Sequence, residues 1–359
     1  MKKIYFTVGP SQIYPSVYAH IKQGLKEDIL SLSHTGKDFI DLYKRTSNSL
    51  RKLLNIPETY HIFFTGSSTE SMERVISNTV YKNSTHLITG GFAQKFYKTA
   101  LDLRKHPVPI EIPLDKESDF SQLQIPQDTE LLCITENDTS TGMRIPLEAF
   151  TSIKRNNPGL LIAVDVVSSI PYVKVDYSII DLVFFSIHKG LGLPAGLGIL
   201  IVSEAAIEKA KFLNKKGIAI GSHHSFISLA EKEKIFKTPA TPNVFYIYLL
   251  EKVIHDMSTK GIEDIRLETE KKAKMIYDFF DKHDRYKPIV HELYRSMTTP
   301  VIDVQGNAEH IVDRLAERGL IISKGYGANS NQHIRIANFP SITEEHIKNL
   351  LISMKECLD

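Results

Sequence analysis

Two stretches decide the fold class and the chemistry: Phe185-Ser186-Ile187-His188-Lys189-Gly190, which ends one apolar run, and Ala163-Val164-Asp165, which ends an earlier one. A lysine at the end of a buried strand can condense with the aldehyde of pyridoxal phosphate. A carboxylate on the neighbouring strand can hold the pyridine nitrogen protonated, so that the ring withdraws electrons. The pair therefore predicts a pyridoxal phosphate enzyme with Lys189 and Asp165 as catalytic residues.

Each half of this pair has an ordinary alternative. An Asp after an apolar run is commonly a helix N-cap, and a Lys there is commonly a solvated strand end. Further polar turns after other apolar runs favour the catalytic interpretation. One is residues 137–142, Asn-Asp-Thr-Ser-Thr-Gly, in which Thr139 could donate to the phenolate oxygen of the cofactor. The alternative is that these residues only form a turn.

A second polar turn, Gly66-Ser67-Ser68-Thr69, leads from an apolar run into a helical pattern. The first amides of such a helix bind phosphate well, although Ser or Thr could equally be a simple N-cap. Phe92 follows the pair Gly90-Gly91 after the next run. Its ring could stack on the cofactor or fill the core.

Six short apolar runs are continuous rather than alternating, which is typical of strands buried on both faces. They cover residues 61–65, 86–89, 131–135, 160–167, 182–188 and 197–203. Helical patterns lie between several of them, so we predict an α/β fold with helices on both sides of a sheet. After about residue 240 the pattern changes. We predict a large domain over residues 16–250, and a smaller α+β domain that consists of residues 251–359 together with the N-terminal segment 1–15.

Composition argues against several classes of partner. The 44 basic and 42 acidic side chains nearly balance, and no basic stripe alternates with aromatic residues, so no nucleic-acid partner is predicted. The pair His223-His224 lacks the spacing of zinc ligands, so no metal is predicted. Residues 190–196 are rich in glycine but lead into a strand rather than a helix, which excludes the nicotinamide motif.

The sequence also predicts a cytoplasmic protein. Gly9 and Pro10 interrupt the apolar start of the chain before a signal peptide could form. The longest apolar stretch, residues 191–202, is too short to span a bilayer, so no membrane partner is predicted. The two cysteines, Cys133 and Cys357, fit a reducing compartment rather than a disulfide scaffold.

From end to end, the sequence resembles the class V aminotransferases of fold type I, and within that class it is most similar to the phosphoserine aminotransferases. The resemblance rests on residues 6–10, 33–39, 186–196 and 238–243. It implies a large domain with a mostly parallel seven-stranded sheet between helices, and a smaller C-terminal α+β domain. It also implies a homodimer with active sites at the interface.

The resemblance further implies roles for individual residues. Lys189 would hold the cofactor covalently, Asp165 would contact the pyridinium nitrogen, and Phe92 would stack on the ring. The cofactor-binding set is Gly66, Ser67, Ser68, Thr69, Phe92, Thr139, Asp165, Ser168, His188, Lys189 and, from the other subunit, Thr238. The substrate-binding set is His34, Thr35 and Arg335, with Arg335 gripping the α-carboxylate through its bidentate guanidinium.

The sequence departs from phosphoserine aminotransferases where those enzymes carry basic residues directed at the substrate phosphate. Here the corresponding positions are Thr35, Thr69 and the stretch Gly325-Tyr326-Gly327. Each lost charged hydrogen bond is worth about 1.5 to 3 kcal/mol, so two or three losses weaken phosphate recognition by roughly two to six orders of magnitude unless other residues compensate. Five residues could compensate: His34, Lys37, Arg45, Arg74 and Lys324.

The predicted function is thus transfer of an amino group from L-glutamate to 3-phosphohydroxypyruvate, giving 2-oxoglutarate and O-phosphoserine. The main alternative is a class V aminotransferase for unphosphorylated small substrates such as alanine, serine or glyoxylate. Two others are a fold type I lyase or desulfurase, which the placement of both cysteines in regular elements disfavours, and a cofactor-binding regulator without enzyme activity.

Overall fold

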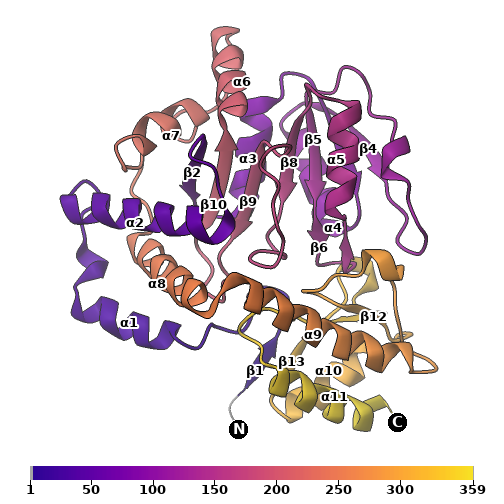
Figure 1. Ribbon diagram of the computed structural model, residues 1–359. Helices are drawn as coiled ribbons and strands as arrows, with labels where there is room; N and C mark the ends of the chain where they lie inside the picture. Colours follow the sequence, from indigo (N-terminus) through magenta and orange to yellow (C-terminus); the bar gives the residue numbers. More distant parts are fainter. Residues whose placement is uncertain (1–2, 359) are drawn as a thin grey trace.

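The computed structural model describes residues 3–358 and contains a larger and a smaller β-sheet, each covered by helices (Figure 1). The larger sheet has seven strands, in the spatial order β2 (Tyr60–Thr65), β10 (Gly198–Ser203), β9 (Leu182–Ser186), β8 (Leu161–Asp165), β5 (Leu131–Thr135), β3 (Asn83–Ile88) and β4 (His106–Glu111). Only β10 runs antiparallel to its neighbours. The predicted mostly parallel, seven-stranded sheet is therefore confirmed.

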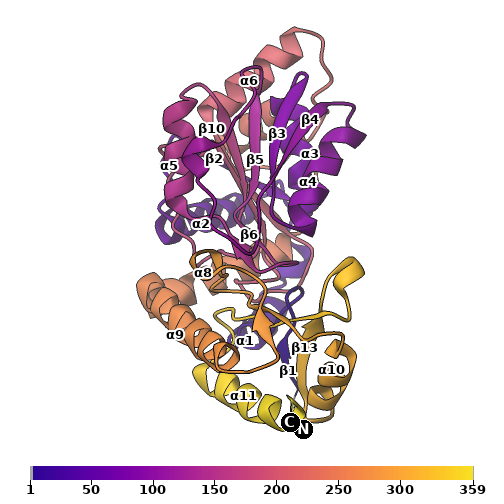
Figure 2. The same ribbon diagram turned by 90° about the vertical axis from the view of Figure 1, so that its right-hand side faces the viewer.

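Strands of this sheet are buried on both faces, because successive side chains point into two different cores. Phe184 belongs to the core under one face, and Phe185 belongs to the core under the other. The first face is covered by α3 (Ser68–Thr79), α4 (Gly91–Asp102), α6 (Glu204–Lys215) and α7 (Phe226–Glu233). The opposite face is covered by α2 (Lys37–Leu54), α5 (Leu147–Asn156) and α8 (Val244–Lys260). Figure 2 shows α3 and α4 on one side of the sheet and α5 on the other.

One strand of the large sheet lacks the continuous apolar run from which the other six were predicted. Strand β4 lies at the sheet edge, contains Pro107 and Pro109, and has only half-buried and exposed residues. Proline is tolerated at such an edge because no neighbouring strand needs its missing N–H. The six apolar runs found in the sequence correspond to the other six strands of this sheet.

The smaller sheet lies below the larger one in Figure 1 and joins the two ends of the chain. Its strands are, in order, β1 (Ile4–Phe6), β13 (Leu320–Lys324), β14 (His333–Arg335), β12 (Val301–Asp303) and β11 (Lys287–Pro288). Helices α9 (Ile262–Asp281), α10 (Ala308–Glu317) and α11 (Glu344–Leu358) pack against it. The remaining elements are α1 (Val17–Lys26), the two-stranded ribbon of β6 (Asn137–Asp138) and β7 (Met143–Arg144), and four short 3₁₀ turns at Ile29–Ser31, Phe120–Gln122, Glu292–Tyr294 and Gly327–Asn329.

The parallel pairing of β1 with β13 places Ile4 opposite Leu320, so the N-terminal strand belongs to the smaller sheet. The proposed division between residues 250 and 251 falls inside α8 and stays a prediction. Along residues 3–358, no helix is long and apolar enough to cross a membrane.

Candidate active site

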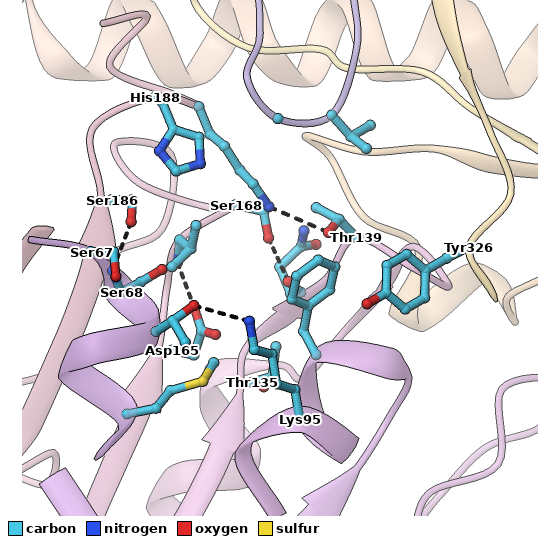
Figure 3. Close-up of a pocket in the computed structure, with 18 of the residues that line it drawn as sticks. Ser67, Ser68, Lys95, Thr135, Thr139, Asp165, Ser168, Ser186, His188 and Tyr326 are labelled. Carbon is cyan, nitrogen blue, oxygen red and sulfur yellow. Dashed lines mark hydrogen bonds between the residues drawn. The ribbon is translucent and has the colours of Figure 1, made fainter. Parts of the chain in front are cut away.

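A cavity of about 280 Å³ opens at the carboxyl ends of the central strands, where β5, β8 and β9 finish at Thr135, Asp165 and Ser186 (Figure 3). Small-molecule sites of open α/β sheets lie at this edge because the loops after the strands converge there. The cavity is lined by Val8, Gly9, Ser67, Ser68, Thr69, Met72, Phe92, Lys95, Thr135, Asn137, Thr139, Asp165, Val167, Ser168, Ser186, His188, Lys189, Ser323, Tyr326 and Arg335. Both sheets contribute, since the last three residues come from the smaller unit.

Lys189 and Asp165 lie in this cavity and are both nearly enclosed, with 6% and 3% of their surfaces exposed. Burial lowers the pKa of Lys189 to about 8, against the opposing attraction of Asp165 and Asp138. Its Nζ donates to the hydroxyl of Thr139 at 3.3 Å. A lysine with such a pKa is partly neutral near physiological pH, as a nucleophilic amine must be.

Burial also raises the pKa of Asp165 to about 7, although the backbone N–H of Val167, at 2.9 Å, and the Lys189 ammonium stabilise its ionised form. A buried carboxylate whose ionised form is disfavoured in this way gains from a protonated group beside it. The Asp165 side chain is thus suited to hold a pyridinium nitrogen.

The N-terminal segment comes close to Lys189 from the other side. A Cβ atom added at Gly9, which has φ of +144°, would lie 2.8 Å from Lys189 Cε. The hydroxyl of Ser11 donates to the carbonyl oxygen of Lys189 at 3.0 Å, and its N–H donates to that of His188. Only glycine therefore fits at position 9 without displacing the lysine side chain.

Phe92 lines the cavity with its ring centroid 5.0 Å from Lys189 Nζ. Asp138 fixes the start of α4, because one of its carboxylate oxygens accepts the N–H groups of Phe92 and Ala93, each at 3.0 Å. The other oxygen accepts the N–H of Ser140. The position of the aromatic ring is therefore set by a carboxylate on the neighbouring turn.

Replacing Asp138 by Asn is expected to lower the free energy of unfolding by about 2 to 3 kcal/mol. Both carboxylate oxygens accept N–H groups, so either orientation of the amide places an NH₂ against a backbone donor. Urea denaturation measures the effect. Asp102→Asn, an exposed change at the other end of α4, is the control and should alter stability by less than about 0.5 kcal/mol. A loss for Asp138→Asn no larger than that of the control would contradict the capping role.

At another wall of the cavity lies the N-terminus of α3. Ser67 is the N-cap, with its hydroxyl accepting the N–H of Glu70 at 3.1 Å, and the N–H of Ser68 donates to the hydroxyl of Ser186 at 2.9 Å. His188 lines the same space, and burial together with the Lys189 charge lowers its pKa to about 4. The neutral imidazole and the helix N-terminus form a polar wall suited to an anion.

The wall from the smaller unit consists of Arg335 and Tyr326. Arg335 is held by two carbonyl oxygens, those of Lys324 at 2.7 Å and Thr139 at 3.3 Å. Its guanidinium carbon lies 5.7 Å from the centroid of the Tyr326 ring, which in turn lies 5.3 Å from that of Phe92. Tyr326 thus lies between Arg335 and Phe92.

Most of the residues predicted from the sequence come together in this cavity, but four do not. Gly66 and Thr238 line a neighbouring cavity on the other side of the turn that precedes α3. His34 and Thr35 lie in the segment before α2 and line neither cavity. Ser168 is in the cavity, with its hydroxyl donating to the carbonyl oxygen of Asn137 at 2.6 Å.

Sequence reasoning missed several lining residues, of which Lys95 is the most informative. Its Nζ donates to the hydroxyl of Thr69 at 3.1 Å. Lys95 follows Phe92 by three positions in a helix, a spacing that places both side chains on one face, so this signal was available. None of the five residues suggested as compensating cations lines the cavity.

Three buried polar atoms of residues that line the cavity have no hydrogen-bond partner within residues 3–358. They are Thr135 Oγ1, Asn137 Nδ2 and His188 Nδ1. Buried polar groups are normally paired, so these atoms point to a polar molecule that occupies the cavity. These atoms, the buried carboxyl group of Asp165 and the lowered pKa of Lys189 together fit a cavity that binds pyridoxal phosphate.

Comparison with known proteins decides the family. The sequence profile of the aminotransferase class-V family matches residues 4–348. The chain is a class-V aminotransferase. Its cofactor is accordingly pyridoxal phosphate, which the cavity accommodates chemically.

Individual relatives of the aminotransferase agree in fold and differ in substrate. It is 27% identical over 356 residues to the phosphoserine aminotransferase of Lactococcus lactis subsp. cremoris, with 93% of this chain and 94% of the relative covered. A crystal structure of a phosphoserine aminotransferase from Cytophaga hutchinsonii matches with a TM-score of 0.95 and 39% identity, covering 99% of this chain and 98% of that one. An alanine–glyoxylate aminotransferase from Nostoc matches with a TM-score of 0.81 and 21% identity, covering 100% and 96% of the two chains, which shows the shared fold.

The aminotransferase freed of cofactor should recombine with pyridoxal phosphate at a rate that rises with pH through about 8. Only the neutral Lys189 amine attacks an aldehyde, and burial places the pKa of this amine at about 8. Stopped-flow absorbance between pH 6 and 9.5 measures the rate. A rate that keeps rising up to pH 9.5 without levelling would show that the Lys189 pKa is not lowered.

Proposed function

We propose that this aminotransferase exchanges an amino group between glutamate and 3-phosphohydroxypyruvate, producing 2-oxoglutarate and O-phosphoserine. The main support for this proposal is the similarity to the Cytophaga hutchinsonii protein named phosphoserine aminotransferase, which is 39% identical and matches 99% of this chain. The charges of the cavity support it. Lys95, Lys189 and Arg335 line a single space, which suits a substrate with more than one anionic group.

In this proposal the residues of the cavity divide the work. Pyridoxal phosphate, when bound, supplies an electron sink for the pair left behind as the α-proton departs. Lys189 Nζ would take that proton from the α-carbon of the amino acid and hold it for return within the cavity. Asp165 would hold the ring nitrogen of the cofactor in its protonated form, and Phe92 would exclude water beside the ring. Arg335, fixed by two carbonyl oxygens, binds the α-carboxylate through its guanidinium.

We also propose a homodimer in the cytoplasm. The observation that supports the dimer is the position of His34, Thr35 and Thr238, all outside the cavity that holds Lys189 of the same chain. In a dimer, these side chains would complete the cavity of the partner subunit. Sedimentation of the purified enzyme at micromolar concentration tests this, and a monomer that is fully active would contradict it.

A second candidate is transfer between unphosphorylated substrates such as alanine, serine and glyoxylate. The observation in its favour is the presence of Thr35, Thr69 and Tyr326 where the resemblance leads us to expect basic residues. Uncharged groups at these places would leave a phosphate less well compensated than in other phosphoserine aminotransferases.

The half-reaction distinguishes the two candidates. The yellow holoenzyme is mixed separately with phosphoserine, glutamate, alanine and serine, and the loss of its visible absorbance is followed. For the phosphoserine assignment, glutamate and phosphoserine bleach the enzyme, and phosphoserine does so at concentrations at least about 100-fold lower than serine, which is the gain expected if the cations of the cavity make two charged hydrogen bonds to the phosphate. Bleaching by alanine or serine with no response to phosphoserine would establish the second candidate instead.

A further inference from the structure

Lys95 lies at the wall of the active-site cavity and makes no close ion pair, although its charge helps to lower the pKa of Asp165 across the same space. Within residues 3–358, no carboxylate oxygen lies within 4.0 Å of its Nζ. Among the described residues, this ammonium donates a single hydrogen bond, to the hydroxyl of Thr69, the second residue of α3. Figure 3 shows Lys95 directed from α4 toward the space between α3 and the strand ends.

The place where this ammonium points is built for an anion. Helix α3 has 12 residues and begins at Ser68, so the positive end of its dipole faces the cavity. Thr135 lies nearby at the end of β5 in Figure 3, is 1% exposed, and has a hydroxyl oxygen with no partner within the described residues. A helix N-terminus, an unpaired ammonium and an unpartnered buried hydroxyl thus line one wall.

The position of Lys95 also accounts for a departure noted in the sequence. Thr69 stands where the resemblance leads us to expect a basic residue after the glycine turn. Here the cation comes from α4 instead, and its Nζ reaches the Thr69 hydroxyl at 3.1 Å. The charge is therefore kept near position 69 although the residue that carries it lies on another helix.

We propose that Lys95 and Thr69 act as a pair that binds the dianionic phosphate monoester at the N-terminus of α3. Two molecules carry this chemistry into the cavity, the cofactor and, if the proposed function holds, phosphoserine. In either case the ammonium neutralises phosphate charge while Thr69 holds the ammonium in place. The inference rests on the proposed function only for the substrate, because the cofactor is set by the family.

Lys95→Gln tests the proposal, with Lys98→Gln as its matched control, since Lys98 is an exposed lysine of the same helix that does not line the cavity. Equilibrium dialysis measures the binding of pyridoxal phosphate and of unphosphorylated pyridoxal to the cofactor-free proteins. In a separate arm, the cofactor-saturated proteins are titrated with phosphoserine and with glutamate, and the half-saturating concentrations are compared.

If the cofactor phosphate is the ligand, Lys95→Gln weakens pyridoxal phosphate by about 10- to 100-fold and leaves pyridoxal unchanged, because one charged hydrogen bond is lost. If the substrate phosphate is the ligand, only the phosphoserine constant rises, by a similar factor. Lys95→Arg restores most of the loss in either case. Equal losses for pyridoxal phosphate and pyridoxal, or no change in any constant, would overturn the proposal.

The two arms also separate this proposal from the proposed function. If wild-type enzyme does not respond to phosphoserine, the function assignment fails while the cofactor arm still tests Lys95. Thermal unfolding of the variants checks folding, and because Lys95 is exposed we expect its replacement to shift the midpoint no more than Lys98→Gln does.

Discussion

Lys189→Ala is expected to lower the rate of the glutamate half-reaction by about 10⁴-fold. Among the described residues, the lysines that line the cavity are Lys95 and Lys189. Lys189 is the one whose Nζ donates to the hydroxyl of Thr139. In the proposed function, its removal deletes both the nucleophile that anchors the cofactor and the base that moves the α-proton. Single-turnover absorbance changes at saturating glutamate measure the loss.

The design of this test separates chemistry from folding. Gly9 and Ser11 approach the backbone and stem of Lys189, so the variant leaves a space where the stem lay. A small primary amine added to the solution can enter that space, and we expect it to restore part of the rate in proportion to its concentration. A rate within about tenfold of wild type without added amine would exclude Lys189 as the base.

Asp165→Asn is expected to reduce the same rate by about 10³-fold, since a neutral amide does not hold the ring nitrogen protonated. The amide oxygen still accepts the N–H of Val167, so the turn after β8 keeps its shape. The rate measurement again uses glutamate. A variant that turns over like wild type would remove Asp165 from the mechanism.

The stability of the cofactor-free Asp165→Asn protein provides the control. Burial raises the pKa of Asp165 to about 7 in the folded protein, so the ionised carboxylate opposes folding increasingly as pH rises from about 4 to about 7. The amide does not ionise. The variant should therefore be at least as stable as wild type above pH 7 while its activity is lost, which a misfolded protein could not show.

Much of the site could be predicted because its chemistry lies where buried strands end. Asp165 and Ser186 finish strands that are apolar throughout, so both the strands and their polar ends are visible in the sequence. Strand β4 escaped this reasoning because it is an edge strand with two prolines and half-exposed side chains. Continuous apolarity marks only strands that are covered on both faces.

Residues that depend on packing between distant segments were harder to predict. Lys95 enters the cavity because α4 lies beside α3, and Tyr326 enters because the smaller sheet faces Phe92. The helical spacing from Phe92 could have placed Lys95 on the cavity side of α4, but its contact with Thr69, like the contact of Tyr326 with Phe92, depends on packing that no local pattern contains. The approach of Gly9 to Lys189 likewise follows from the pairing of β1 with β13, which no spacing along the chain reveals.

That pairing has a consequence for the order in which the enzyme matures. Strand β1 is synthesised long before β13, because Leu320, the residue opposite Ile4, lies more than 300 residues further along the chain. Contacts between such distant segments form late, because the long loop between them must first be closed. The segment that contacts Lys189 therefore cannot take its place before β13 has been made. A nascent chain that has already made Lys189 should remain unable to retain the cofactor until β13 has emerged.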